Sequence, residues 1–521
     1  MEAVAQTGSS GGAEEVGKRA IVFVGFMGAG KSTAARAVAA ELGVEPLDLD
    51  RELERELGQT VESFFEQHGE DAFREREEEL ALRLLGRSDA RVVALGGGTL
   101  GSGRVRDALA EHVVVHLAVD AEDAWRRASG KGRPLARDRG RFDELHEHRR
   151  SEYETAADAL IPVADRGVAV RALPALLALR EAPAGTRMAW ARAVSDEYPV
   201  FLGRGLVASG FFWPAEGRRF AVTDENVAGR HSIAADWSHA IPAGEEHKTL
   251  GQAEEVLRAM ARAGVAREDL VVAVGGGVVG DLGGFCAAVY QRGIRHVQVP
   301  TTLVAQVDSA YGGKTGVDLP EGKNYAGAYH QPSAVIADPA TLDTLPTAER
   351  AAGYAEVVKT ALIAGGRLWA RVRQGADPDD EVILGCLRTK LAVVAEDERD
   401  EGRRQVLNLG HTVAHAIETV TRYAAYRHGE AVALGLLAAL RLSDAPELRA
   451  EVADLLAARG LPTTLEHADP DAVVMATRRD KKRVGEGPVP FVLLRSPGQP
   501  RPGCAVEPAA LVAAVRELAA S

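Results

Sequence analysis

A glycine-rich segment close to the N-terminus has the residue types that surround nucleotide phosphates. Gly25-Phe-Met-Gly-Ala-Gly-Lys-Ser32 matches the pattern G-x4-G-K-[ST], follows an apolar run and opens a helical pattern. In such a loop the backbone N–H groups turn inward on the phosphates, and the start of the helix adds positive potential. Lys31 would reach the transferred phosphate, and Ser32 would hold Mg²⁺. The predicted phosphate-site residues are Gly28, Ala29, Gly30, Lys31, Ser32 and Thr33.

Two further features favour a kinase over a switch GTPase. A GTPase needs a guanine-reading N-K-x-D segment, and the sequence contains none. Asp48-Leu-Asp50 ends the next apolar stretch and offers one carboxylate for Mg²⁺, through water, and one for an acceptor hydroxyl. By itself such a pair is more often a turn or a helix cap. We therefore predict an ATP-using kinase that acts on a small molecule.

Other polar segments in this region are weak signals when each is taken alone. Arg74 lies on a charged helical stretch, and Gly96–Gly98 follows an apolar run. Arg133 lies in a polar, glycine-rich loop of the kind that closes over a ligand. Arg149 precedes Tyr153 by four residues. An arginine on such a helix is usually solvated, and a triple glycine is often only a turn.

A second strand–glycine–helix pattern spans Leu270–Asp281. Its run Gly275-Gly-Gly-Val-Val-Gly280 would let backbone approach a pyrophosphate at a helix start. It is not G-x-G-x-x-G, so the motif by itself leaves dinucleotide binding open. The loops expected after the following strands are dense in Gly, Thr, Lys and Asn, which suits a polyhydroxylated, phosphorylated ligand. These loops are Pro300–Thr302, Asp308–Lys314 and Lys323–Asn324.

Histidines in the last third of the chain are candidates for a metal site. His411 and His415 are four residues apart and so share one helix face. Most isolated pairs at that spacing bind no metal. Glu356 and His428 are candidates for the third and fourth groups, and three N/O ligands with an open position describe a catalytic zinc-like site. Spacing does not decide which of the four residues are ligands.

Composition excludes several classes of protein. The 521 residues carry 62 Lys+Arg and 75 Asp+Glu, a net charge of -13. This acidity argues against non-specific nucleic-acid binding but permits anionic small substrates. No apolar run reaches the ~20 residues of a membrane span, and the N-terminus lacks the pattern of a signal peptide. Because the three cysteines are isolated, we expect no disulfides and a cytoplasmic protein.

Short β-branched runs alternate with longer helical patterns, which is typical of parallel α/β sheets. We expect strands at residues 20–24, 92–95, 113–119, 220–223, 270–274, 297–299 and 334–337, and helices at 31–42, 71–85 and 173–179. A Pro/Gly break places a boundary near residue 184. The expected order is a flexible tail (1–18), a P-loop domain with a parallel sheet (19–182), a linker (183–187), a Rossmann-like α/β half (188–346) and a mostly α-helical half (347–521).

Taken in order, the first set of residues resembles shikimate kinase over roughly residues 18–182. The resemblance implies that Asp50, Arg74, Gly97 and Arg149 hold shikimate, with the two arginines clamping its carboxylate. It selects Arg149 over Arg150 by the spacing to Tyr153. It also assigns Asp48 and Ser32 to Mg²⁺, Arg133 to the lid over ATP, and catalysis to Lys31, Asp50 and Arg133.

From about residue 187 onward the chain is similar to 3-dehydroquinate synthase, which uses NAD and Zn²⁺ or Co²⁺. The further runs that carry this resemblance are Arg292-Gly293, Lys390, Arg404, Asn408 and Asp480-Lys-Lys482. It implies that Glu356, His411 and His428 bind the metal and that His415 lies on the substrate side. It assigns to NAD the residues Asp224, Glu245, Lys248, Gly277, Val278, Val279, Gly280, Asp281, Thr301, Thr302, Lys314 and Lys323. It assigns to the substrate Arg292, Asn324, Lys390, Arg404, Asn408 and Lys482, and to catalysis Lys314, Lys359, Lys390, Arg404 and His415.

This second resemblance also implies a reaction and an assembly. NAD would transiently oxidise an alcohol of 3-deoxy-D-arabino-heptulosonate 7-phosphate, phosphate would be eliminated, the hydride would return, and ring opening and an aldol closure would give 3-dehydroquinate. Arg292 is expected to reach a neighbouring subunit's site, which implies a homodimer. Ala414 replaces a usual Gly, and Ala310-Tyr311 replaces a usual Ser-Val; we expect altered packing there.

Several alternatives remain open. Other small-molecule P-loop kinases, such as those for gluconate or nucleotides, lack the combination of Asp-x-Asp, Phe-Arg and Gly-Gly-Gly. Metal-dependent alcohol dehydrogenases would release reduced cofactor, and other sugar-phosphate cyclases differ in how they hold a carboxylate. One half could also be a degenerate regulatory module, although the intact Lys31, Glu356 and His411 argue against that.

Overall fold

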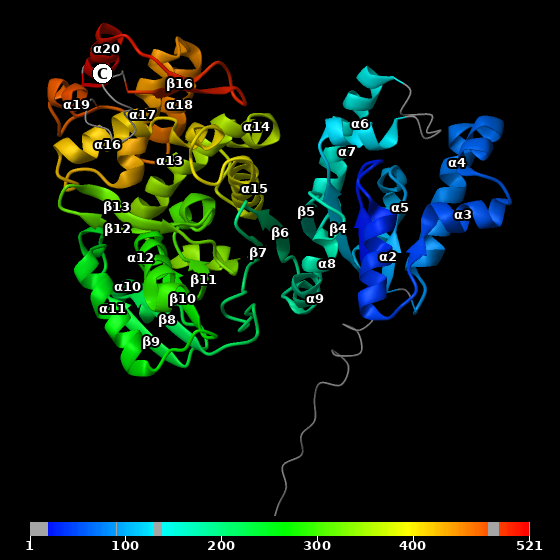
Figure 1. The fold of residues 1–521 in the computed structure, drawn as a ribbon. Coiled ribbons are helices and arrows are strands. Elements are labelled where there is room, and N and C mark those ends of the chain that lie inside the picture. The colour runs from blue at the N-terminus through cyan, green and yellow to red at the C-terminus, as the bar shows by residue number, and fades with distance from the viewer. Residues whose placement is uncertain (1–18, 90, 130–137, 478–488, 520–521) are drawn as a thin grey trace, which may run out of the picture. The chain divides into compact units, whose positions relative to one another are not determined.

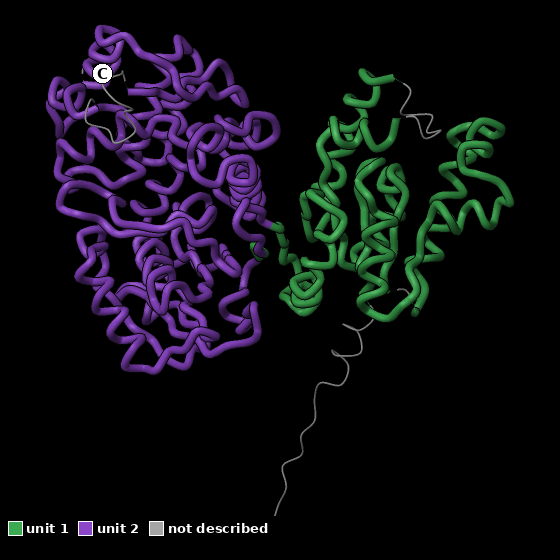
Figure 2. Tube along the Cα trace, viewed as in Figure 1, with its two compact units in different colours: residues 1–190, 199–201 green, residues 191–198, 202–521 purple. Residues whose placement is uncertain are grey.

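The chain passes from one folded unit to the next within β6 (Arg187–Arg192) and β7 (Glu197–Leu202). The computed structural model describes residues 19–89, 91–129, 138–477 and 489–519. Unit 1 comprises Met1–Trp190 and Pro199–Phe201, and unit 2 comprises Ala191–Tyr198 and Leu202–Ser521 (Figure 2). The finer domain bounds drawn from the sequence remain predictions.

The sheet of unit 1 is parallel, and its apolar strands are covered by helices (Figure 1). Its strands follow the order β2-β3-β1-β4-β5-β6. The short β-branched runs are buried because parallel sheets have helices on both faces. The three strands predicted in this region are confirmed. The strand bounds are β1 (Ile21–Val24), β2 (Leu47–Asp48), β3 (Val92–Ala94), β4 (Val113–Ala118) and β5 (Ala159–Pro162).

Parallel pairing brings the loops that follow β1, β2 and β3 to one edge of this sheet. In register, Ile21 of β1 pairs with Val92 of β3, and Asp48 of β2 pairs with Ala94. The phosphate loop, the carboxylates near β2 and the glycines after β3 therefore lie at the same carboxyl edge, where α/β sheets bind ligands. The helices are α2 (Lys31–Leu42), α3 (Leu49–Leu57), α4 (Val61–Leu85), α5 (Gly103–Leu109), α6 (Ala121–Ala128), α7 (Arg139–Ala156), α8 (Val168–Arg171) and α9 (Leu173–Glu181).

Helix α4 differs from the prediction at its start. The expected helix over 71–85 is the second part of a longer one that begins at Val61 and is capped by the Thr60 side chain. The two parts meet at Gly69, which has φ 81° and interrupts the helical conformation. Arg74 lies one turn after this break, so the bend helps to set where its side chain points.

The sheet of unit 2 has parallel strands in the order β14-β11-β10-β8-β9. Helices α11 and α12 pack on it through buried apolar residues such as Met260 and Leu282. The predicted strands in this half are confirmed. The bounds are β8 (Arg219–Asp224), α10 (Glu225–Ala228), β9 (Trp237–Ile241), α11 (Leu250–Ala263), β10 (Leu270–Gly275), α12 (Gly277–Val289), β11 (Arg295–Pro300) and β14 (Ala334–Ala337).

The prediction of loops for the Lys314 and Lys323–Asn324 segments is wrong. These residues belong to an antiparallel hairpin, β12 (Lys314–Leu319) and β13 (Gly322–Tyr329), in which Lys314 pairs with Tyr329. The strands carry several glycines, and a Cβ on Gly316 or Gly327 would collide with the backbone of the other strand. Such glycine content hides a strand from propensity-based reasoning.

From Thr347 onward the described residues are mostly helical, as predicted (Figure 1). A small sheet of β15 and β16 was not predicted. None of the described helices has the length and apolar character that crossing a bilayer requires. The bounds are α13 (Thr347–Ala364), α14 (Gly366–Arg373), α15 (Asp380–Glu396), α16 (His411–Val420), α17 (His428–Leu442), α18 (Pro446–Ala457), α19 (Pro470–Thr477), β15 (Phe491–Leu494), β16 (Pro500–Cys504) and α20 (Pro508–Ala519).

Candidate active sites

The loop between β1 and α2 has backbone conformations that require glycine. Gly28 and Gly30 have φ values of 84° and 87°, a region that residues with a Cβ rarely occupy. A Cβ on Gly28 would also lie 2.8 Å from the carbonyl oxygen of Ala124. Nζ of Lys31 donates to the carbonyl oxygen of Gly25 at 2.9 Å, so the ammonium group lies over the loop. The other predicted phosphate-site residues lie in the same loop or in the first turn of α2: Ala29, Ser32 and Thr33.

The three glycines after β3, Gly96–Gly98, are the surface on which the predicted acceptor residues gather. A Cβ on the first would lie 3.4 Å from Oδ1 of Asp50, and one on the second 3.7 Å from a terminal nitrogen of Arg149. A Cβ on the third would collide with the guanidinium of Arg74. The missing side chain of Gly98 thus leaves room for the Arg74 guanidinium, and that of Gly96 leaves room for the Glu77 carboxylate, with which a Cβ would also collide. Asp50 and Arg149 lie at ordinary contact distance from the run. The structure brings together all four residues predicted to hold the acceptor.

Helix α7 distinguishes Arg149 from its neighbour. Arg150 is exposed and pairs with Glu147 at 2.6 Å, whereas Arg149 is half-buried beside Gly97. One turn later, the hydroxyl of Tyr153 donates to the carbonyl oxygen of Gly97. Burial raises the pKa of Tyr153, so the phenol stays protonated and remains a donor. The placement agrees with the choice of Arg149.

Two carboxylates complete this site, and the sequence reasoning missed one of them. Glu77 is 3% exposed and accepts hydrogen bonds from Arg74 at 2.5 Å and from the Thr99 hydroxyl at 2.9 Å. The sequence could have suggested Glu77 as a partner of Arg74, because residues three positions apart on a helix are neighbours. Asp48 caps α3 by accepting from the N–H of Arg51 at 3.4 Å, the cap role that its motif alone favoured.

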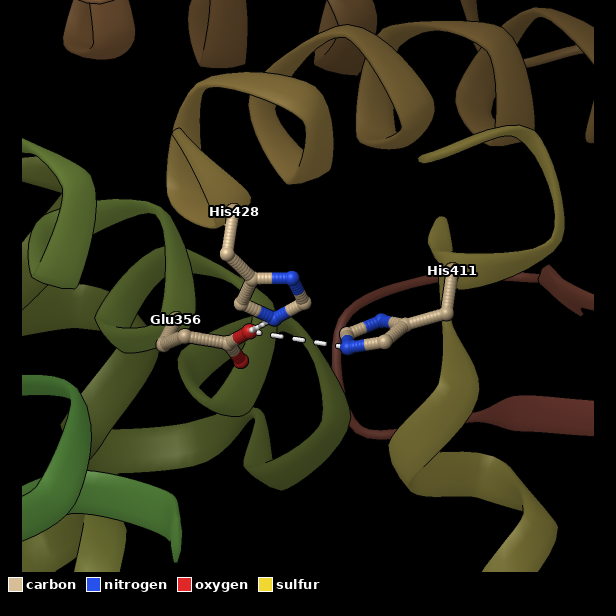
Figure 3. Close-up of side chains that lie close together, drawn as sticks. All are labelled: Glu356, His411 and His428. Carbon is tan, nitrogen blue, oxygen red and sulfur yellow. Dashed lines mark hydrogen bonds and ion pairs between the residues drawn. The ribbon is translucent and has the colours of Figure 1, made fainter. Parts of the chain in front are cut away.

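In unit 2, close helix packing brings three metal-ligand side chains together (Figure 3). A Cβ on Gly429 would collide with the backbone of Ala352, so α17 approaches α13 closely at its first turn. His428, the first residue of α17, therefore lies with Nε2 3.2 Å from Oε1 of Glu356 on α13. His411, the first residue of α16, places Nε2 3.5 Å from the same oxygen. One atom from each of the three residues lies within 4.8 Å of the others.

Glu418 supports this cluster and was not predicted. It is 2% exposed and lies 3.3 Å from Nδ1 of His428, the nitrogen that faces away from Glu356. Burial opposes a charge on His428, but the hydrogen bonds to Glu356 and Glu418 outweigh burial and raise its pKa to about 10. Glu418 follows His411 and His415 at helical spacing, and that spacing was the signal for it. His415 itself lies beside His411, with ring centroids 5.4 Å apart.

Asp308, which the sequence suggested only as the start of a polar loop, forms ion pairs with two lysines predicted to be catalytic. Its carboxylate lies 2.8 Å from Nζ of Lys359 and also accepts from Lys390. Lys359 additionally pairs with Glu356 at 2.5 Å. Burial lowers the pKa of Lys390, whereas Asp308 and Glu356 overcome burial and raise the pKa of Lys359. The two ammonium groups are thus held in a low-dielectric site by one carboxylate.

The turn between β10 and α12 carries the glycines of the predicted dinucleotide cradle. A Cβ on Gly276 would lie 2.9 Å from Thr302, one on Gly277 3.2 Å from Ser309, and one on Gly280 2.8 Å from the Gln298 side chain. A Cβ at any of these positions would therefore press on a neighbouring side chain, so glycine lets the start of α12 lie close to β11 and to the residues that follow it. The predicted residues at its rim are Gly277, Val278, Val279, Gly280 and Asp281 in the first turn of α12, Thr301 and Thr302 after β11, and Asp224 at the end of β8.

Several charged residues that are predicted to bind NAD form ion pairs with one another next to this turn. Lys248 is 4% exposed and lies 2.9 Å from Glu245 and 3.3 Å from Asp281. Lys323 lies 3.4 Å from Glu245 and 3.1 Å from Glu418. Burial opposes ionisation of Glu245, but the two lysines lower its pKa to about 2.

The other residues predicted to bind substrate or NAD lie on several different elements of the synthase unit. Lys314 is exposed and pairs with Asp400 at 2.6 Å, and Asn324 is exposed on β13 with φ 55°. Arg404 is 2% exposed, Asn408 ends the same short helix, Arg403–Asn408, and Arg292 is exposed before β11. Arg133 and Lys482 lie outside the described residues.

Comparison with known proteins identifies both units. The family of the 3-dehydroquinate synthase N-terminal part matches residues 238–352, and that of the C-terminal part matches residues 353–483. The chain is 44% identical over 340 residues to a 3-dehydroquinate synthase of Acidithiobacillus ferrooxidans, covering 93% of that protein and 60% of this chain. The chain belongs to the 3-dehydroquinate synthase family. The shikimate kinase family matches residues 27–173. The protein is therefore a bifunctional shikimate-pathway fusion, and we call unit 1 the kinase unit and unit 2 the synthase unit.

Two solved synthase structures share the fold of the synthase unit. A 2-deoxy-scyllo-inosose synthase complexed with carbaglucose-6-phosphate, NAD⁺ and Co²⁺ is 25% identical with a TM-score of 0.55, covering 63% of this chain and 99% of that one. ValA, a 2-epi-5-epi-valiolone synthase from Streptomyces hygroscopicus with NAD⁺ and Zn²⁺ bound, is 27% identical with a TM-score of 0.55, covering 62% and 96%.

Proposed function

We propose that the kinase unit phosphorylates shikimate with ATP. The observation that carries this proposal is the convergence of Asp50, Arg74 and Arg149 on the glycine run Gly96–Gly98, at the same sheet edge as the phosphate loop. Two guanidinium groups beside one carboxylate suit an acceptor that bears both a carboxylate and hydroxyls. A neutral sugar would offer the two arginines no carboxylate or phosphate to bind.

In this proposal the kinase works by positioning and by neutralising charge. Arg74 and Arg149 hold the acceptor carboxylate, and Asp50 orients the hydroxyl that attacks. Lys31 and the loop N–H groups stabilise charge on the transferred phosphoryl group. Ser32 and Asp48 would hold Mg²⁺, which neutralises phosphate charge when bound; Asp48 can do so because its helix cap uses only one carboxylate oxygen.

We propose that the synthase unit converts 3-deoxy-D-arabino-heptulosonate 7-phosphate to 3-dehydroquinate and phosphate, using NAD and Zn²⁺ or Co²⁺. The cluster of Glu356, His411 and His428 carries this proposal, because one carboxylate and two imidazoles form a donor set that suits these cations. The glycine cradle before α12 suits a dinucleotide. When bound, the cation polarises a substrate oxygen and NAD accepts and returns a hydride.

The chain's own groups in this site bind anions and hold protons. Lys359 and Lys390 present two ammonium groups, fixed by Asp308, to the phosphate and carboxylate of the substrate. We assign Arg404, Asn408 and Lys314 as further donors to the substrate, and His415 as the imidazole for proton transfer. Asp224, Glu245, Lys248 and Lys323 line the nucleotide side.

The relatives support this substrate over the alternatives. Identity is 44% to a 3-dehydroquinate synthase, against 25% and 27% to synthases whose names indicate other products. A metal-dependent alcohol dehydrogenase would release reduced cofactor at every turnover. Steady accumulation of NADH during the reaction would therefore contradict the proposal.

The experiment assays both reactions on the full chain and on one variant for each site. Lys31→Ala should abolish shikimate phosphorylation and leave phosphate release from the heptulosonate phosphate unchanged. Glu356→Gln should abolish phosphate release from the heptulosonate phosphate and leave shikimate phosphorylation unchanged. A variant that loses both activities would contradict the assignment of two independent sites.

We further propose that the synthase unit acts as a homodimer in which Arg292 reaches the neighbouring subunit's site. Arg292 is exposed, and both Arg292 and Gln291 have positive φ, at 71° and 49°, a strained backbone conformation of the kind that clusters at functional sites. Mixing inactive Arg292→Ala and Glu356→Gln proteins should restore activity, since a hybrid contains one complete site. Absence of restoration after subunit exchange would contradict the shared site.

A further inference from the structure

Arg404 is buried in the synthase unit and is held by two backbone carbonyls. Its guanidinium donates to the carbonyl oxygen of Gly312 at 3.0 Å and to that of Glu398. A Cβ on Gly312 would lie 2.7 Å from the same guanidinium, so the chain approaches it as closely as a glycine allows. These two carbonyls fix the direction of the planar group, because a guanidinium has little freedom once two N–H groups are bound.

Glu398, whose carbonyl is one of these two acceptors, is itself held by a segment more than 200 residues earlier in the chain. The backbone N–H of Ser195 donates to the Glu398 carboxylate at 2.9 Å, and the Ser195 hydroxyl donates to its other oxygen. The side-chain amide of Gln331 adds a bond of 2.9 Å. Glu398 is 6% exposed, and these hydrogen bonds outweigh its burial and lower its pKa. The carboxylate therefore stays ionised and its bonds are charge-assisted.

The same segment also holds Gly312, whose carbonyl is the second acceptor for Arg404. The N–H of Gly312 donates to the hydroxyl oxygen of Tyr198 at 3.1 Å. Tyr198 is 1% exposed, and burial raises its pKa to about 12, so it remains a neutral phenol. Ser195 and Tyr198 thus contact the two residues whose carbonyls bind Arg404, one on each side of the guanidinium.

Other contacts of the Arg404 loop come partly from within it and partly from the β12–β13 hairpin, where the Tyr329 hydroxyl donates to the carbonyl oxygen of Arg399 at 2.8 Å. Asp397 accepts from the N–H groups of Gly402 at 2.8 Å and Arg404 at 2.9 Å. The loop also contains Asp400, the partner of Lys314. Asp397 thus shapes the loop from within, and Glu398 is the point at which Ser195 and Gln331 attach it to the rest of the unit.

We propose that Ser195 and Tyr198 are positioning residues for Arg404. The segment Ser195–Tyr198 belongs to the first stretch of the synthase unit, Ala191–Tyr198. It supports the substrate-binding guanidinium and its loop from behind. It touches neither substrate nor cofactor. This inference rests on the proposed function of Arg404 in holding the anionic substrate.

The test uses the full chain with Ser195→Ala and Tyr198→Phe, each of which removes one hydroxyl. Since Arg404 is proposed to bind substrate before and during reaction, loosening it should raise KM for the heptulosonate phosphate about fivefold per variant and leave kcat within about twofold. Ser195→Thr, which keeps the hydroxyl, should restore KM. Ser209→Ala is the matched control, because the Ser209 hydroxyl also serves a turn, donating to Leu206 at 2.9 Å. Shikimate phosphorylation should not change in any of these variants.

Hydrogen exchange of the loop amides provides a second readout that needs no activity. Exchange over residues 397–404 should rise about tenfold in Ser195→Ala and stay at the wild-type rate in Ser209→Ala. Unchanged exchange overturns the proposal, and so does faster exchange with an unchanged KM. If the wild-type protein releases no phosphate from the heptulosonate phosphate, the proposed function fails, while the exchange comparison still decides whether the segment holds the loop.

Discussion

The kinase and synthase units hold their charged site residues in different ways. Around Arg74 the ion pairs join residues three or four positions apart on one helix, and Glu70 is exposed. In the synthase unit the pair of Lys390 with Asp308 spans 82 residues of sequence, and that of Lys323 with Glu418 spans 95. These four side chains are each less than a quarter exposed.

The synthase pairs also connect into one chain of alternating charge. The chain of charges runs from the residues proposed to bind substrate, through the proposed metal ligands, to the residues proposed to bind the nucleotide. Its members, in order, are Lys390, Asp308, Lys359, Glu356, His428, Glu418, Lys323, Glu245, Lys248 and Asp281. Removing one member of a buried network leaves its neighbours uncompensated, whereas an exposed local pair contributes little. The two sites should therefore differ sharply in their sensitivity to single neutral substitutions.

The largest difference is expected for Asp308→Asn. This change leaves two buried ammonium groups without their shared carboxylate, so the free energy of unfolding of the synthase unit should fall by about 3–5 kcal/mol. Glu70→Gln in the kinase unit should cost less than about 0.5 kcal/mol. Denaturant unfolding followed for each unit measures both effects. Equal losses in the free energy of unfolding for Asp308→Asn and Glu70→Gln would contradict the expected difference between the two units.

The next largest effect is expected at the metal cluster. Glu418→Gln weakens the partner that orients His428, so affinity of the synthase unit for Zn²⁺ should fall about 10–100-fold. Competition with a chelator measures this affinity. Glu451→Gln, which alters a carboxylate paired with Arg373 on another helix, is the control. A metal affinity unchanged by Glu418→Gln would show that the buried carboxylate does not serve the cluster.

A smaller effect is expected in the kinase unit, where neighbouring arginines differ in placement. Arg149→Ala should raise KM for shikimate about tenfold, because a charge-assisted contact to the substrate carboxylate is lost. Arg150→Ala should change KM less than about twofold, since its partner Glu147 is exposed. Initial-rate measurements at varied shikimate decide between them, and a larger effect from Arg150→Ala would reverse the assignment.

The smallest effect concerns acid stability near the nucleotide cradle. Two lysines hold the pKa of Glu245 at about 2, below its ordinary 4.5. A lowered pKa stabilises the folded state above pH 4.5, and this contribution is lost as pH falls toward 2. Because the side chain is 35% exposed, solvent screening limits the contribution to about 1 kcal/mol. Glu245→Gln should be less stable than wild type at pH 7, with the difference shrinking in acid; a difference independent of pH would contradict the ionic origin.

Much of both sites could be predicted because their motifs are local. The phosphate loop depends on glycine conformations and a helix start within nine residues. His411 and His415 share a face because helical periodicity places them there. The strand predicted at residues 92–95 located the loop that carries Gly97.

The residues that were missed depend on contacts distant in the sequence or on burial. Asp308 gains its role from α13 and α15, and the hairpin residues Lys323 and Asn324 were misassigned because glycine-rich strands lack a propensity signal. Ser195 and Tyr198 carry no motif. Their role follows from the packing of an early segment against a loop that comes much later in the chain.

The sequence by itself therefore determined the kinds of chemistry present, namely a phosphate loop, a glycine cradle and a set of metal-ligand side chains, because each follows from backbone preferences over one or two turns. Only the tertiary structure decided how those groups work together. Close approach of α13, α16 and α17 joined Glu356, His411 and His428, and burial turned separate lysines and carboxylates into one alternating network. Burial removes the water that would otherwise screen these charges, so their energies depend on the whole fold.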